Sequence, residues 1–352
     1  MLLYIHIPFC DSKCFYCAFN SYVTLFHLKQ QYMEALEIQL KYELKKLNNK
    51  TLKSIFIGGG TPSCIDTKYY TNIFYTLQPY ITKDTEITTE ANPNSASKQW
   101  LKGMKDLGVN RISFGVQSFN DEKLKFLGRN HNKIQAIQAI NLANELGYKH
   151  INCDIIYDTI KDTKELISND LQIIKTLPID HISAYSLTIE EGTKFFDKTN
   201  VKIENIDMAQ YIFDQLLNFG FKQYEISNFA KSTQSQSIHN FGYWEKDNYL
   251  GVGAGAVGAI DDKRYYPQKD IPNYIKEPLK YEQIETLDKE DIRFEKIFLG
   301  LRSDVGVDID ILKKDELKKL DILVKEDKIT IKNNKFYNTN FLITDEIVMF
   351  LI

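Results

Sequence analysis

Short runs of apolar and β-branched residues recur through the first half of the sequence, and each is followed by a polar turn and a stretch with helical spacing. The six runs are LLYIHI, SIFIGG, EITTEA, RISFGV, INCDIIY and HISAYSL. Alternation of this kind predicts β-α-β units. The helical connection between two parallel strands of one sheet is almost always right-handed, so we expect right-handed units here. We therefore expect an α/β fold with a parallel sheet that is either open or curled into a barrel.

The segment CDSKCFYC, which begins at residue 10, holds three of the five cysteines with the spacing C-x3-C-x2-C. A structural zinc site normally has four ligands in two pairs, and neither His6 nor Cys64 completes a second pair. A disulfide framework also fits poorly, because the cysteine count is odd and MLLYIHIPF lacks the features of a signal peptide. An iron–sulfur cluster in a reducing cytosol remains, and three thiolates would leave one iron of a [4Fe–4S] cluster open.

Polar and glycine-rich residues follow the predicted strands where each strand ends. The cysteines follow the first strand. The second strand is followed by Gly58, Gly59, Gly60 and Thr61, and the third ends at Glu90, Asn92 and Pro93. The fourth carries Gln117 and Ser118, the fifth Asp154, and the sixth Tyr185 and Ser186. Any one of these is ordinarily a turn or capping residue. Because the carboxyl ends of parallel strands meet at one edge, their joint placement predicts a ligand site there.

Composition excludes several other classes of function. The formal net charge is −3 and the basic residues are scattered, so we expect no nucleic-acid partner. No apolar run approaches the roughly 20 residues that span a bilayer. The segment YLGVGAGAVG contains G-x-G-x-x-A, but DNYL is a poor strand before it, so we expect a tight glycine turn near the sheet edge instead of a nicotinamide site.

Taken together, YIHIPFCDSKCFYCAF, GGGTP, EANP and RISFGVQSF resemble the radical S-adenosylmethionine superfamily, and within it the oxygen-independent coproporphyrinogen III oxidase-like group. The resemblance covers nearly the whole chain. It implies that Cys10, Cys14 and Cys17 hold a [4Fe–4S] cluster whose open iron is chelated by S-adenosylmethionine. It also implies that one electron from the cluster can cleave the sulfonium to a 5′-deoxyadenosyl radical.

The same resemblance assigns further residues to the cofactor. The positions implied to bind S-adenosylmethionine are Tyr4, Tyr16, Gly59, Gly60, Thr61, Glu90, Gln117, Arg129 and Asp154. Carboxylates and amides suit the ribose hydroxyls and the ammonium group, and Arg129 suits a carboxylate. The chain departs from the group's YGLPGQT-like loop beyond Asp154, where it reads Tyr157, Asp158 and Thr159.

We expect three parts in the chain. Residues 1–200 are predicted to form a partial (β/α)6, TIM-like barrel, and residues 201–280 a β-containing extension with the HNFGYW motif. Residues 281–352 are predicted to form a small helical, winged-helix-like cap domain with a hairpin that turns at Asn333 and Asn334.

Two features separate the subgroups of this family. The true oxidases read C-x3-C-x2-C-x-C and carry a long N-terminal extension, whereas here Phe19 lies two residues after Cys17 and nine residues precede Cys10. The chain is therefore more similar to the HemW-like haem chaperones, which implies haem binding without coproporphyrinogen oxidase activity. The alternative is a radical S-adenosylmethionine oxidase or transferase that acts on a tetrapyrrole or another substrate.

The stretch HNFGYW, residues 239 to 244, matches the HNxxYW motif of the HemW-like proteins. Imidazole ligates haem iron readily and aromatic rings pack on a porphyrin, so the resemblance assigns His239, Tyr243 and Trp244 to haem. An HN turn followed by core aromatics is the alternative interpretation.

The remaining expectations concern partners and the other cysteines. The expected partners are haem, an unidentified haem acceptor protein with a transient membrane association, and a second copy of the chain in a homodimer. Cys64 and Cys153 are expected to be inert, because a free cysteine in an apolar setting behaves as a small hydrophobe. His6 is expected to hydrogen-bond behind the cysteine site.

Overall fold

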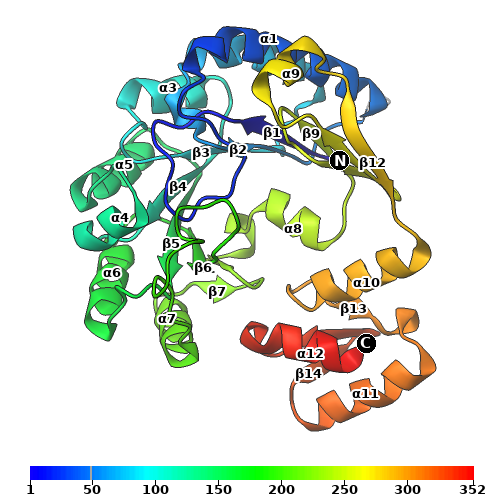
Figure 1. Ribbon diagram of the computed structural model, residues 1–352. Helices are drawn as coiled ribbons and strands as arrows, with labels where there is room; N and C mark the ends of the chain where they lie inside the picture. Colours follow the sequence, from blue (N-terminus) through cyan, green and yellow to red (C-terminus); the bar gives the residue numbers. More distant parts are fainter. Residues whose placement is uncertain (48–49) are drawn as a thin grey trace.

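The computed structural model describes residues 1–47 and 50–352 and places all six predicted runs in one curved sheet (Figure 1). The strands are β1 (Leu2–Ile7), β2 (Ser54–Gly59), β3 (Glu86–Ala91), β4 (Arg111–Gln117), β5 (His150–Tyr157) and β6 (His181–Ser186). Each strand pairs in parallel with the next one along the chain. The edge strands of the described sheet do not pair with each other, so the predicted partial barrel is confirmed.

The sheet continues past β1 and past β6. Beyond β1 lie β9 (Tyr249–Val252), β10 (Gly258–Ile260), β11 (Lys263–Pro267) and β12 (Tyr281–Thr286), and beyond β6 lie β8 (Asn228–Ala230) and β7 (Lys222–Gln223). β9 is parallel to β1, whereas β8 is antiparallel to β6. The chain thus extends both edges of the six-stranded core after completing it.

Helices cover the outer face of the curved sheet (Figure 1). They are α1 (Lys29–Leu44), α2 (Thr71–Leu77), α3 (Lys98–Asp106), α4 (Asp121–Leu127), α5 (Lys133–Glu145), α6 (Lys164–Thr176) and α7 (Ile206–Asn218). Local sequence fixes their ends: α5 begins at a capping box between Asn132 and Gln135, and α4 ends at Gly128, whose φ is 75°. In α6, Ile167, Leu171 and Ile174 are buried, as expected for one face of an amphipathic helix.

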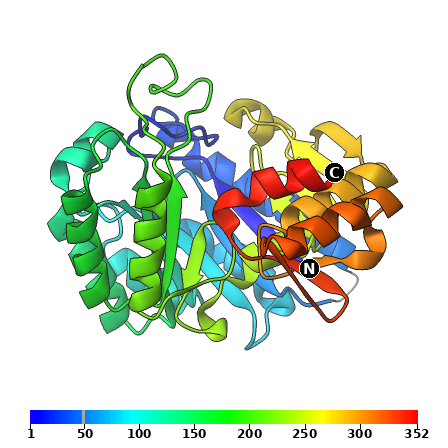
Figure 2. The ribbon, with the colours of Figure 1, turned by 90° about the horizontal axis from the view of Figure 1, so that it is seen from below.

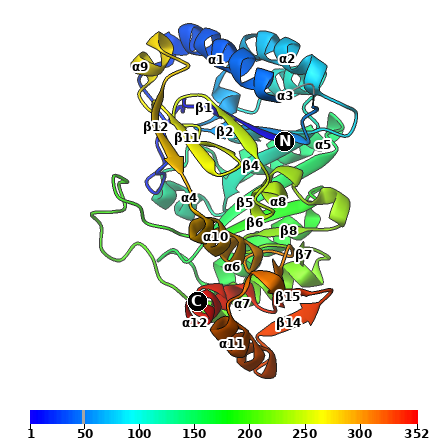
Figure 3. The ribbon, with the colours of Figure 1, turned by 90° about the vertical axis from the view of Figure 1, so that its right-hand side faces the viewer.

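The C-terminal part has a hydrophobic cluster of its own. It contains α10 (Lys289–Gly300), β13 (Val307–Asp308), α11 (Lys314–Lys325), β14 (Ile329–Lys332), β15 (Lys335–Asn338) and α12 (Thr344–Leu351). The cluster includes Ile297, Leu320 and Phe336, and Figure 3 shows this part beside the barrel. The predicted hairpin is confirmed, because Asn333 and Asn334 both have positive φ between β14 and β15. The domain limits at residues 200 and 280 stay a prediction.

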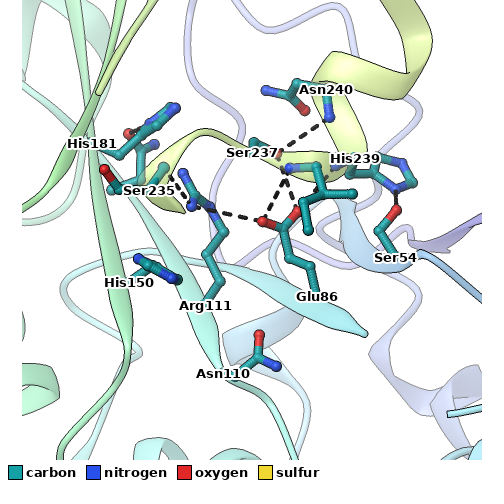
Figure 4. Close-up of polar contacts among 12 residues, drawn as sticks. Ser54, Glu86, Asn110, Arg111, His150, His181, Ser235, Ser237, His239 and Asn240 are labelled. Atoms are coloured by element: carbon teal, nitrogen blue, oxygen red, sulfur yellow. Dashed lines mark hydrogen bonds and ion pairs between the residues drawn. The ribbon is translucent and has the colours of Figure 1, made fainter. Parts of the chain in front are cut away.

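A further helix, α8 (Ile238–Trp244), lies on the inner side of the curved sheet, and the short α9 (Ile271–Lys276) packs against α1 outside it (Figure 1). The Glu86 carboxylate accepts hydrogen bonds from the backbone N–H groups of Ile238 and His239, both at 3.1 Å (Figure 4). Arg111, 2% exposed, pairs with Glu86 at 3.7 Å and donates to the Ser235 carbonyl. Because Glu86 and Arg111 begin β3 and β4, α8 lies at the amino ends of the strands.

Replacing Glu86 by alanine is expected to lower the free energy of unfolding by about 3 kcal/mol, because it leaves the buried Arg111 guanidinium unpaired and removes the acceptor at α8. Urea denaturation followed by circular dichroism measures the change. Glu122→Ala is the matched control, since Glu122 is 79% exposed and pairs with Lys125 on the surface, and it should leave the midpoint near that of the wild type. Equal midpoints for the two variants would contradict the stabilising role of Glu86.

Candidate cofactor site

A cavity of about 550 Å³ opens at the carboxyl ends of the parallel strands. The loops that follow β1 and β6 rise at this same edge of the sheet (Figure 2). Of the residues predicted to form the site, those that line the cavity are Cys10, Cys14, Tyr16, Cys17, Gly59, Gly60, Thr61, Glu90, Asn92, Gln117, Arg129, Asp154, Tyr185 and Ser186. The structure thus brings together residues from separate strands and loops, and it does not bring Tyr4, Gly58, Pro93, Ser118, His239, Tyr243 or Trp244 to this cavity.

The cysteine loop is closed by backbone hydrogen bonds at its base. The Cys10 N–H donates to the Tyr22 carbonyl at 3.1 Å, and the Tyr22 N–H donates to the Pro8 carbonyl at 2.8 Å. Cys10 is buried, with its Sγ 3.2 Å from Thr61 Oγ1, while Cys14 and Cys17 are partly exposed. The loop therefore presents its sulfurs to the cavity from a fixed base.

Two of the thiols, Cys10 and Cys17, sit in a setting that disfavours their free thiolates. Burial raises the pKa of Cys10 and of Cys17, while Arg129 Nη1 donates to Cys14 Sγ at 3.2 Å. Among the described residues, no three His, Cys, Asp or Glu side chains converge on a single metal ion. A cluster, in which each thiolate binds a different iron, fits this spacing better than zinc does.

The glycine turn after β2 packs where no side chain could fit. Gly59 has a φ of 112°, and a Cβ built on it would lie 2.4 Å from the His6 ring. The Gly60 N–H donates to the Ile7 carbonyl at 2.8 Å, and the Gly59 N–H donates to Glu90 Oε2 at 3.0 Å. These contacts press the turn against β1 and leave its backbone facing the cavity.

Two carboxyl groups face the cavity and their pKa values are both raised. Burial, with a contribution from Asp154, raises the pKa of Glu90 to about 8. Burial also raises the pKa of Asp154 to about 6, against the hydrogen bonds from Ser183, Asn152 and Ser113, which favour the anion. A cationic ligand in the cavity would favour ionisation of both carboxyl groups, as expected of a site that binds a positively charged group.

Arg129 and Gln117 each leave one buried polar atom unsatisfied. Arg129 Nη2 donates to Asn92 Oδ1 at 2.6 Å, but its Nε has no partner within the described structure. Gln117 Oε1 is likewise buried without a partner there, and the residue has a φ of 69°. An unpaired buried donor and an unpaired buried acceptor at one cavity wall fit a polar ligand that would satisfy both.

Tyr4 and His6 support the site from behind. The Tyr4 hydroxyl lies 2.9 Å from His6 Nδ1, and His6 Nε2 lies 2.8 Å from the Asn20 carbonyl in the cysteine loop. His6 therefore has the hydrogen-bonding role that was predicted. The Tyr4 ring stacks on Phe56 and reaches the site through His6, not through the cavity wall.

Sequence reasoning named Asn92 among the residues at strand ends, but it omitted Lys13 and Glu190. Asn92, within EANP, links Arg129 to Thr61, because its Nδ2 donates to Thr61 Oγ1 at 3.1 Å. Lys13 and Glu190 also line the cavity from two different loops. The position of Asn92 directly after a predicted strand is the signal that identified it, whereas nothing in the local pattern distinguishes Lys13 or Glu190 from surface charges.

The glycine turn in YLGVGAGAVG lies near this edge, as predicted. Asn20 Nδ2 in the cysteine loop donates to the Ala254 carbonyl at 3.0 Å and to the Lys269 carbonyl at 2.9 Å. The turn therefore anchors the loop that carries the cysteines. Beyond Asp154, the loop that departs from the family pattern is held by the Lys123 ammonium, which donates to Asp162 at 2.5 Å.

His239 lies at the other end of the strands. Its Nδ1 is 2.8 Å from the hydroxyl of Ser54, the first residue of β2 (Figure 4). Its Nε2 is 2.9 Å from the Tyr243 hydroxyl, and its ring stacks on Phe56. The side chain is 1% exposed, and burial lowers its pKa to about 3, so the ring is neutral with both nitrogens engaged.

Tyr243 adjoins a second, smaller cavity of about 240 Å³ between α8, β9–β11 and α10. Tyr249, Lys246 and Arg264 line it as well. Glu295 forms ion pairs with both Lys246 and Arg264. Trp244 lies outside this cavity lining, so the three residues assigned to haem do not share one exposed face.

Comparison with known proteins agrees with this architecture. The sequence pattern of the Radical SAM superfamily matches residues 4–169. The solved structure of coproporphyrinogen III oxidase (HemN) from Escherichia coli, described as a radical SAM enzyme, superposes with a TM-score of 0.84. That match covers 99% of this chain and 89% of the other at 23% identity, so it supports the fold alone.

Sequence relatives identify the subgroup. The haem chaperone HemW of Lactococcus lactis is 34% identical over 316 residues, covering 86% of this chain and 82% of the relative. The HemW of Bacillus subtilis is 33% identical over 318 residues, covering 86% and 84%, and that of Escherichia coli is 37% identical over 265 residues, covering 73% and 70%. The chain therefore belongs to the HemW family of the radical SAM superfamily.

Proposed function

We propose that this protein is a haem chaperone that holds a [4Fe–4S] cluster and S-adenosylmethionine and transfers haem to an acceptor protein. The observation that carries the proposal is the extended identity to relatives named haem chaperone HemW. The cavity supports it, because thiols of the loop after β1, unpaired polar atoms and the carboxyl groups of two separate strands meet there. We further propose that it acts in a reducing cytosol, where thiols stay available for the cluster.

Within this proposal, Cys10, Cys14 and Cys17 hold the cluster. The glycine turn with Thr61 offers backbone groups to the methionyl end of S-adenosylmethionine, while Glu90 and Asp154 accept hydrogen bonds from its hydroxyl or ammonium groups. Tyr16, Gln117 and Arg129 complete the wall. When bound, the reduced cluster supplies the electron that can cleave the sulfonium.

Haem ligation is proposed for α8, with His239 as the axial ligand and Tyr243 and Trp244 beside the ring. Phe56, Tyr243 and Tyr249 around His239 support an aromatic surrounding. Iron could bind Nε2 after the Tyr243 hydroxyl moves away, because that hydroxyl now occupies the nitrogen. Haem binding at α8 therefore includes a local rearrangement of this helix.

The proposed partners are haem and an acceptor protein that associates transiently with a membrane, and a homodimer is proposed as the working assembly. No helix in residues 1–47 and 50–352 is long and apolar enough to cross a bilayer.

The second candidate function is a radical S-adenosylmethionine oxidase or transferase, which the fold match to HemN favours. Anaerobic incubation of reconstituted protein with reductant, S-adenosylmethionine and either coproporphyrinogen III or haem separates the two. Decarboxylation of coproporphyrinogen III would overturn the chaperone proposal.

Serine at Cys10, Cys14 or Cys17 is expected to abolish the cluster, because an alkoxide is a poor ligand for iron that thiolates bind well. Iron and sulfide analysis after anaerobic reconstitution should give about four of each per wild-type chain, as a [4Fe–4S] cluster requires. Serine at Cys153, which is buried inside β5, and at Cys64 serves as control and should leave the iron content unchanged. A full cluster in the Cys14 variant would refute the assignment.

Replacing His239 by alanine is expected to weaken haem binding tenfold or more, equal to about 1.4 kcal/mol, with loss of the Soret shift. Tyr243→Phe distinguishes ligation from a structural role, because it frees Nε2 while keeping the ring. If His239 is the ligand, Tyr243→Phe should bind haem at least as tightly as the wild type. His150→Ala, at a histidine whose Nδ1 is paired with Asp180, is the control and should bind haem normally. Unchanged affinity in His239→Ala would exclude His239 as the ligand.

A further inference from the structure

A line of hydrogen bonds crosses the interior of the barrel from the start of α8 to Asp154. The Ser237 N–H donates to the Tyr224 hydroxyl at 3.1 Å, and that hydroxyl lies 2.7 Å from His181 Nε2. His181 Nδ1 lies 2.6 Å from Asn152 Oδ1, and Asn152 Nδ2 donates to Asp154 Oδ1 at 2.6 Å. The three linking side chains are each no more than 4% exposed.

Every bond in this line runs in one direction. Asn152 Oδ1 can only accept, so His181 carries its proton on Nδ1 and its Nε2 must accept the proton of the Tyr224 hydroxyl. Burial and the neighbouring Arg111 lower the pKa of His181 well below its usual value, so the ring has that one proton. The amide of Asn152 is oriented so that its NH2 group also donates to Ser113 and Ser183. Along this line, from Ser237 through Tyr224, His181 and Asn152, each donor therefore points to the next group toward the Asp154 carboxylate.

We propose that Tyr224, His181 and Asn152 are positioning residues of the S-adenosylmethionine site, which orient the Asp154 carboxylate as an acceptor and tie it to the start of α8. The inference rests on the proposed function, because it takes Asp154 as a cofactor contact. Asn152 precedes Asp154 by two residues in β5, so both side chains point to the same side of the sheet.

Two further observations support this role. The hydrogen bonds that Asp154 accepts lower its pKa against the effect of burial, so they favour the ionised, accepting form. Hydrogen bonds that follow one another in a low-dielectric interior strengthen each other, so the far end of the line contributes to the geometry at Asp154. Tyr224 would thus influence a cavity that it does not line.

The experiment measures S-adenosylmethionine affinity in reconstituted full-length variants, by titrating the electron paramagnetic resonance signal of the reduced cluster and by equilibrium dialysis. Tyr224→Phe removes the donor to His181, and Asn152→Asp replaces the donor to Asp154 by a second carboxylate of the same shape. We expect the dissociation constant to rise about threefold or more in Tyr224→Phe and about tenfold or more in Asn152→Asp, with the full iron content retained. Asn152→Ser replaces Asn152→Asp if the latter does not fold.

Tyr148→Phe is the matched control for a purely structural effect. The Tyr148 hydroxyl is also buried and donates one hydrogen bond, to the Leu101 carbonyl at 2.8 Å, but it has no link to Asp154. The Tyr148→Phe variant should lower the melting temperature about as much as Tyr224→Phe does, and it should leave the affinity for S-adenosylmethionine unchanged. Wild-type affinity in Tyr224→Phe and Asn152→Asp, or equal losses in Tyr148→Phe, would overturn the inference.

The same titrations separate the inference from the proposed function. If the wild type does not bind S-adenosylmethionine, the proposed function fails. If the wild type binds it and Asp154→Ala binds it equally well, the cofactor site stands and the positioning role of this line is overturned. Weaker binding in Asp154→Ala, Asn152→Asp and Tyr224→Phe together supports the inference.

Discussion

The in-register parallel pairing of β1 through β6 is the constraint on which this structure depends. Parallel strands bring their carboxyl ends to one edge, so residues as far apart in sequence as Cys10 and Asp154 meet at one cavity. The same pairing brings the amino ends together at the opposite edge. From Ser54 to Gly59, β2 spans five residue steps, about 16 Å at the usual rise per residue, so the strand separates the α8 end from the cofactor end.

The inside of this barrel is polar, which is costly unless each buried group finds a partner. At the amino ends, Glu86 meets this requirement by pairing with Arg111 and by accepting hydrogen bonds from the start of α8. In the middle of the barrel, the buried side chains of Asn152 and His181 hydrogen-bond to each other. Two of the buried polar atoms that stay unpaired among the described residues, Gln117 Oε1 and Arg129 Nε, lie at the cavity wall where a ligand is proposed.

Local patterns predicted much of this architecture. The six strand runs, the turn at Asn333 and Asn334 and the cavity residues at strand ends, such as Thr61, Glu90 and Asp154, follow from period, turn chemistry and position, whereas Tyr16 and Arg129 were implied only by the family resemblance. The surroundings of His239 could not be predicted, because its partner Ser54 lies 185 residues earlier. Long-range pairs of this kind leave no periodic signal, and the same holds for His181 with Tyr224.

The cysteine loop is held in place by segments of the chain that are synthesised much later. β1 is flanked by β2 and by β9, and Asn20 of the cysteine loop is held by the carbonyls of Ala254 and Lys269. A chain still on the ribosome lacks these contacts until more than two hundred further residues have been made. The loop therefore reaches its final shape late in translation, and a group held by its cysteines would be bound only after nearly the whole barrel has been made.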